Sequence, residues 1–212
     1  MFVLYSESAI GYCQVMPKVS DAHRESRRHE IAQAALRCFA RTGFQATSMA
    51  DIIAESGLSA GAIYGHYKSK DELVQLAISE VLDARFLEVA EARRHDPIPT
   101  PGEIIALLVR GLQSQIGDLS LLVQVWGQVA LNPGLRSLTD SIGGRVRAML
   151  VDYLTEWYES SLTLPRGEAA DLAERYAGLY VGVVQGYVTQ STLFSDFDAD
   201  AYLAAAASIR PA

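Results

Sequence analysis

Residues 47–70 read TSMADIIAESGLSAGAIYGHYKSK and carry the signals of two short helices separated by a tight turn. Ser48 and Asp51 have the spacing of a capping box, in which the hydroxyl and the carboxylate each bind a free amide at the start of a helix. Gly57 supplies a turn residue, and Ser59 can cap a second, very short helix. The stretch therefore predicts a helix-turn-helix, with its first helix starting directly after Ser48.

The segment before this stretch has the pattern of an amphipathic helix, which begins near Arg24. Ile31, Ala35 and Phe39 recur at four-residue spacing, with charged residues on the opposite face. Gly43 is expected to end this helix as a C-terminal cap. One longer helix and two short ones are thus predicted to pack into a small head.

The rest of the chain also has helical patterns. Ser69 can cap a long helix that we expect to continue until Pro97 blocks it. Further helices are predicted near residues 102–116, 119–131, 134–160, 167–193 and 199–209. β-Branched residues lie within helix-spaced apolar stretches and no hairpin turns bound them, so we expect no strands. The predicted fold is all-α, with an N-terminal helix-turn-helix head and a C-terminal helical-bundle body.

Charge divides the chain in the same way. Residues 17–70 hold eight Lys or Arg against five Asp or Glu, whereas residues 71–212 hold ten against nineteen. A basic head suits a polyanion such as DNA, and an acidic body avoids it. We therefore divide the chain into an N-terminal extension (1–22), a DNA-binding head (23–70) and a helical body (71–212). Within the extension, Met16 is an alternative start of the chain.

Composition limits the remaining possibilities. The two cysteines are too few for a disulfide framework, and no Cys or His cluster has the spacing of a zinc site. The first sixteen residues lack the basic region that precedes the apolar stretch of a secretory signal. We expect a cytoplasmic protein that holds no cofactor or metal.

The head resembles that of the tetracycline-repressor (TetR) family over residues 24–72. The resemblance rests on Thr47-Ser48, on Asp51-Ile52 and on the run from Gly57 to Lys70. The body is similar to that family only in the number and length of its helices. The resemblance implies a homodimeric, ligand-responsive transcription regulator and not an enzyme. It would act most often as a repressor that binds a palindromic operator and is released by a small amphiphilic effector, although activation stays open.

The resemblance also assigns roles to residues of the head. Phosphate contacts fall on Ser48, Tyr64, His66 and Lys70. Base contacts fall on Ala60, Gly61, Tyr64 and Gly65, with Ser59 beside them chiefly as a helix cap. Because these positions hold no Arg, Asn or Gln, we expect DNA shape and thymine-methyl contacts to carry much of the specificity. The opposite side of the short helix is expected to pack inward through Ala62, Ile63 and Tyr67.

In the family resembled, the body binds a small molecule and its last two long helices pair with a second subunit. Candidate pocket residues combine apolar walls with a few hydrogen-bonding groups: Trp126, Gln128, Met149, Tyr153, Trp157, Tyr180 and Gln185. Small residues at every fourth position allow close approach of a second subunit: Gly178, Gly182 and Gly186. Plain core packing is the alternative for the first set, and packing within one subunit for the second. Ligand binding would tilt the helix over 71–95 and change the spacing of the two heads.

Three other interpretations compete with this one. Residues 176–195 hold no charge, as in a membrane-spanning helix, but they are too polar and no basic flank follows them. Residues 57–61, GLSAG, match the G-x-S-x-G elbow of hydrolases, but no strand is predicted before Ser59. A DNA-binding protein that takes no ligand is the third, and a test for small molecules that change DNA affinity would distinguish it.

Overall fold

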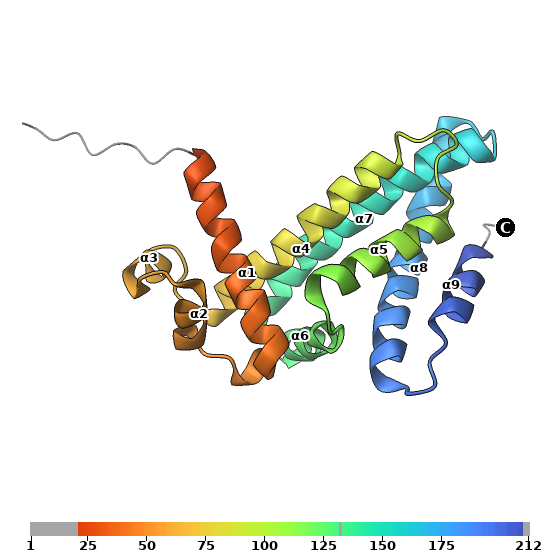
Figure 1. Ribbon diagram of the computed structural model, residues 1–212. Helices are drawn as coiled ribbons and strands as arrows, with labels where there is room; N and C mark the ends of the chain where they lie inside the picture. Colours follow the sequence, from red (N-terminus) through yellow and green to blue (C-terminus); the bar gives the residue numbers. More distant parts are fainter. Residues whose placement is uncertain (1–20, 132, 210–212) are drawn as a thin grey trace, which may run out of the picture.

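The computed structural model describes residues 21–131 and 133–209, and every regular element in these ranges is an α-helix, as predicted. Nearly all of the predicted extension over 1–22, including the alternative start Met16, lies outside the described residues. Figure 1 shows the N-terminal helices α1 (Asp21–Ala46), α2 (Met49–Ser56) and α3 (Ala60–Tyr64) together at one end of the molecule.

The head packs around the apolar face of α1. Ile31 and Phe39 of α1 are buried, as are Ile52 of α2 and Ile63 of α3. Full burial of a side chain of this size contributes roughly 1.5–3 kcal/mol to the free energy of folding. Each isoleucine therefore does much to hold a helix as short as α2 or α3 against the rest of the head. Ion pairs add to this packing, since Glu55 of α2 binds two arginines of α1.

The body consists of α4 (Lys70–Ala92), α5 (Pro101–Ile116), α6 (Ser120–Leu131), α7 (Pro133–Ser161), α8 (Arg166–Leu193) and α9 (Ala199–Ala207). In Figure 1, α4 leads from the head into the body and runs beside α7. α7 packs along α8, and α5 lies against α4, α8 and α9. α6 contacts both α1 and α7, so it sits where the head meets the body.

Most predicted helix limits agree with the structure to within two residues, but two differ in an informative way. The backbone leaves the helical conformation at Gly43, with φ 79° and ψ 163°, yet one more helical turn follows as far as Ala46. α4 ends at Ala92 and does not continue to Pro97. There the amides of Arg94 and His95 bind carbonyls three residues back, so the helix tightens and stops in a polar segment before the proline.

The structure also bears on the competing interpretations. Over residues 21–131 and 133–209, no helix has both the length and the apolarity needed to cross a bilayer. Ser59 lies between two helices, and that described part of the chain contains no strand on which a hydrolase elbow could be built.

Candidate DNA-binding surface and ligand cavity

The short helix α3 is held by one capping residue and one buried anchor. The hydroxyl of Ser59 accepts the N–H of Ala62 at 3.2 Å, and Ile63 has no exposed surface. Tyr64 is 48% exposed, and Gly61 and its neighbours on this side are open to solvent. The structure therefore presents one continuous outward face made of Ala60, Gly61, Tyr64, Gly65 and His66.

One inward position of α3 was predicted wrongly. Ala62 is exposed, whereas Ile63 is buried and Tyr67 is half-buried just beyond the helix. Because α3 has only five residues, it turns only once around its axis and has room for one side chain on the core side. Ala62 thus joins the exposed face of the helix.

The start of α2 has the predicted capping box. The hydroxyl of Ser48 accepts the N–H of Asp51 at 3.2 Å, and the N–H of Ser48 donates to the Asp51 carboxylate at 2.8 Å. The same hydroxyl donates its hydrogen to this carboxylate at 2.7 Å, and these bonds lower the pKa of Asp51. A phosphate contact by the Ser48 hydroxyl would therefore replace its bond to Asp51.

Lys70 connects the start of α4 to the end of α1. Its ammonium donates to the carbonyls of Phe44 at 3.0 Å and Gln45 at 3.2 Å, and it lies 4.5 Å from the centre of the Phe44 ring. An ammonium has three N–H donors, so one is left for a phosphate. Lys70 thus holds the start of α4 against the end of α1, a structural role that its position in the motif did not reveal.

Glu55 joins α2 to α1 by two ion pairs. Its carboxylate accepts from Arg37 at 2.7 Å and from Arg41 at 3.0 Å. Hydrogen bonds from Arg37 and then Arg41 lower the pKa of Glu55, because both stabilise its charged form. These contacts fix the angle between α1 and α2, and hence the position of the surface that α3 presents.

A cavity of about 360 Å³ lies inside the body, with walls from α1, α4, α5, α6, α7 and α8. Its lining is almost entirely apolar, as in pockets for small organic molecules. Three of the seven predicted pocket residues line it: Trp126, Met149 and Gln185.

The other four predicted pocket residues, Gln128, Tyr153, Trp157 and Tyr180, are not among the lining residues of this cavity. The Tyr153 phenol donates to the carbonyl of Pro99 at 2.6 Å, and burial raises its pKa. Trp157 is buried against the ring of Tyr158, with 5.5 Å between ring centres, and Tyr180 is 2% exposed. These three residues belong to the core of the body, where α7 meets its neighbours.

The sequence patterns missed two parts of the wall. Leu36 and Phe39 of α1 line the cavity, so it reaches into the head. Arg85 of α4 also lines it, four residues after the buried Val81 and four before the buried Val89. A charged residue on an apolar helical stripe was the signal that could have identified Arg85.

The three glycines of the predicted dimer stripe have different surroundings. A Cβ on Gly186 would lie 2.5 Å from the Tyr202 hydroxyl of the same chain, whereas nothing lies within 4 Å of a Cβ on Gly182. A Cβ on Gly178 would have only a loose contact, 3.9 Å from Arg147. Gly186 thus serves packing within one chain, and Gly178 and Gly182 stay exposed on α8.

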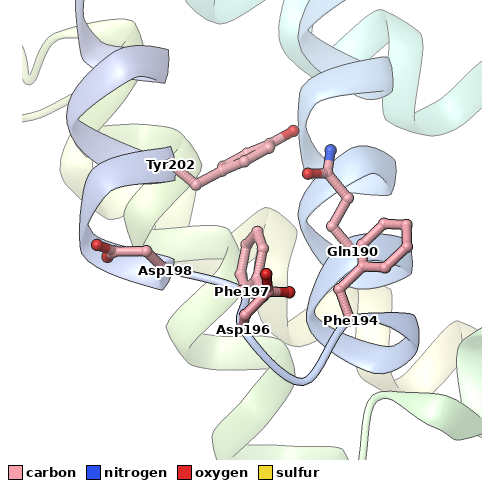
Figure 2. A pocket seen from close by; sticks show the side chains of 6 residues that line it. All are labelled: Gln190, Phe194, Asp196, Phe197, Asp198 and Tyr202. Atoms are coloured by element: carbon pink, nitrogen blue, oxygen red, sulfur yellow. The ribbon is translucent and has the colours of Figure 1, made fainter.

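Figure 2 shows the hollow where α8 turns into α9, with Tyr202 pointing toward α8. The Tyr202 hydroxyl donates to the carbonyl of Val183 at 2.7 Å, directly beside Gly186. This close approach explains why the α8 position opposite Tyr202 has no side chain. The hollow itself is wide open and is lined by Gln190, Phe194, Asp196, Phe197, Asp198 and Tyr202.

Comparison with known proteins agrees with this geometry. Residues 31–77 match the family model described as "Bacterial regulatory proteins, tetR family", which covers α2 and α3 and parts of α1 and α4. The head over these residues is of the TetR type. Among relatives, it is 34% identical over 82 residues to the uncharacterised HTH-type regulator YfiR of Bacillus subtilis, covering 39% of this chain and 40% of YfiR.

A second relative is the HTH-type transcriptional repressor AcnR of Corynebacterium diphtheriae, 34% identical over 107 residues, or 44% of this chain and 56% of AcnR. The chain thus matches only about half of these relatives or less. A solved regulator from Pseudomonas aeruginosa is 26% identical, with a TM-score of 0.62 over 86% of this chain and 88% of that one. One from Saccharomonospora viridis, solved with choline, is 21% identical, with a TM-score of 0.62 over 86% and 94%.

Proposed function

We propose that this protein is a ligand-responsive DNA-binding regulator of the TetR family, most simply a repressor, in the cytoplasm. The observation that carries the proposal is a cavity whose wall includes Leu36 and Phe39, because both belong to α1, the helix on which α2 packs. A molecule in the cavity would touch the DNA-binding head directly. The division into a head (23–70) and a body (71–212) is part of this proposal.

The outward face of α3 is suited to the major groove. Its small residues let the backbone approach the bases closely, and Tyr64 can reach a phosphate or a base edge. Ser48, Ser59 and His66 are exposed around this face, and Lys70 keeps one donor free beside it. Since this set offers few groups that read base edges, we expect much of the specificity to come from DNA shape.

We infer that two chains act together on a palindromic operator. The exposed stretch of α8 around Gly178 and Gly182 includes Leu179, which is 48% exposed, and lets a second chain approach closely. Two-fold pairing of this kind presents two heads to two half-sites.

Release would follow from a difference in shape between the DNA-bound and ligand-bound states. The recognition helices of a dimer must fit major grooves that recur every ~34 Å, so a change in their separation weakens binding. A ligand with a hundredfold preference for one state supplies roughly 2.7 kcal/mol of coupling. α4 and α6 both line the cavity and both contact α1, so a shift of either helix on ligand binding would move the head.

The test is a binding titration with a labelled duplex from immediately upstream of the protein's own coding sequence, beside a scrambled duplex. We expect saturable binding that strongly favours the native duplex and that weakens with salt and with Tyr64→Ala. Arg94→Ala, in the exposed segment just after α4, is the matched control and should bind like the wild type. Equal, weak binding to both duplexes that Tyr64→Ala leaves unchanged would refute the proposal.

A further inference from the structure

The cavity of the body is apolar except where Arg85 lies. Arg85 is the one charged residue among the described residues that line it. It occupies the same face of α4 as the lining residues Val81 and Ile78, and its side chain is only 7% exposed. Placing a guanidinium among hydrocarbon side chains is unfavourable unless its N–H groups have hydrogen-bond acceptors, and the apolar walls supply none.

The guanidinium of Arg85 uses little of its hydrogen-bonding capacity. Nη2 donates to Glu88 at 2.7 Å, whereas Nε and Nη1 are buried and have no partner among the described residues. Glu88 does not line the cavity, and its Oε2 is also buried without a partner among the described residues, so this ion pair lies beside the cavity and not in it. Two N–H-bearing nitrogens therefore remain available to an acceptor that arrives from outside the chain.

Gly111 of α5 provides the space that Arg85 occupies. A Cβ at Gly111 would lie 1.7 Å from Nη1 of Arg85, so a larger residue could not coexist with the guanidinium in this position. Because the stem of Arg85 is flexible, rotation about its side-chain bonds can turn the N–H groups toward a molecule in the cavity. The side chain is thus held beside the cavity and is not locked in a network.

We infer that Arg85 makes this cavity selective for an apolar molecule that ends in a carboxylate. The inference rests on the proposed function, because it names the ligand class of the proposed effector site. A carboxylate forms stronger hydrogen bonds with a guanidinium than a neutral oxygen does. The rest of the molecule would lie among Val74, Val125 and Met149. A cation such as the choline found in the Saccharomonospora viridis regulator would meet a like charge here.

The test compares three probes of equal chain length and different head groups: decanoate, decanol and decyltrimethylammonium. Trp126 lines the cavity and reports its occupation by fluorescence, once Trp157→Phe has removed the second tryptophan. We expect decanoate to bind at least about tenfold more tightly than either other probe, which corresponds to one hydrogen bond between charged groups. Arg85→Met should abolish this preference while decanol binding is unchanged. Arg94→Met, at the surface just after the end of α4, should behave like the wild type.

Equal affinity for decanoate and decanol in the wild type, or no response to any probe, overturns the inference. It is also overturned if Arg85→Met folds, by its circular dichroism, and keeps the preference for decanoate. If Arg85→Met does not fold, the three-probe comparison in the wild type decides alone. Operator binding without ligand separates the two proposals. If the protein prefers decanoate but binds no DNA specifically, the inference about Arg85 stands and the proposed function is refuted. If it binds its operator specifically but does not prefer decanoate, the proposed function stands and the inference about Arg85 is refuted.

Discussion

The side-chain oxygen of Gln124 accepts the backbone N–H of Phe44 at 3.2 Å, across the junction between α6 and α1. Phe44 follows Gly43, where the backbone leaves the α1 helix, and Gln124 precedes two residues that line the cavity, Val125 and Trp126. This one hydrogen bond therefore joins the wall of the proposed ligand site to the base of the proposed DNA-binding head.

Gln124→Ala should uncouple the two sites more than it weakens either. The variant removes the acceptor for Phe44, while the capping box of α2 and the anchor Ile63 stay intact. We expect operator affinity without ligand to change by less than about threefold and ligand-induced release to fall by about tenfold, from the loss of about one hydrogen bond of coupling. Fluorescence anisotropy of a labelled operator measures both quantities. Gln128→Ala, one turn along α6, is the control, and equal effects of the two variants would contradict the account.

Gly143→Leu should occupy the ligand site from α7. Gly143 lines the cavity, and nothing lies within 4 Å of a Cβ built on it. We expect a repressor that still binds DNA but no longer responds to ligand. Replacing a helical glycine should also raise the free energy of unfolding by about 0.5–1 kcal/mol. Gly144→Leu has equally open surroundings but does not line the cavity, so it should gain the stability and keep the response. Chemical denaturation and ligand titration give the two readouts.

Gly182→Glu should separate the proposed dimer. The position is exposed on α8 and has open space around a Cβ, so the chain itself can accommodate a glutamate. Two carboxylates brought together by a two-fold axis would repel each other, and sedimentation should show a monomer with native helicity. Gly167→Glu, near the start of the same helix and equally open, should leave the mass unchanged. A Gly182→Glu protein with the mass of the wild type would place the interface elsewhere.

The head should lose stability in acid through Glu55. Because Arg37 and Arg41 lower the pKa of Glu55, its contribution to stability is present above its ordinary pKa of 4.5 and is lost as the pH falls through the lowered value. Glu55→Gln should therefore reduce the melting temperature at pH 7 and flatten its decline below about pH 4.5. Glu91→Gln breaks an exposed pair with Arg94, three residues away at the end of α4, and should change the profile little. Identical profiles for the two variants would show that Glu55 has no special role.

The head could be predicted from sequence because its signals are local. The capping box of Ser48 and Asp51, the cap at Ser59 and the turn at Gly57 each act within a few residues, and all appear in the structure. The inward orientation of Ala62 was wrong because the helical period assumes a helix longer than the five residues of α3. The role of Lys70 at the end of α1 could not be predicted, because it depends on contacts 25 and 26 residues away.

The cavity was predicted less well because it depends on the packing of distant helices. The sequence predicts aromatic and hydrogen-bonding residues in the pocket, yet Tyr153 and Trp157 lie in the core. There the Tyr153 hydroxyl binds the carbonyl of Pro99 and the Trp157 ring packs against Tyr158. The wall is instead mainly aliphatic and includes α1. Side chains that leave a space are not distinguishable by type from those that fill one, and only their positions in three dimensions separate them.

The most direct test of the account is a hydroxyl-radical footprint of the wild-type protein on the DNA upstream of its coding sequence. We expect two protected regions related by a two-fold axis, with centres in successive major grooves ~34 Å apart. Tyr64→Ala should remove both regions at the protein concentration that saturates the wild type. Protection spread evenly along the duplex, or a single region that Tyr64→Ala leaves unchanged, would contradict the claim that two α3 surfaces bind one operator.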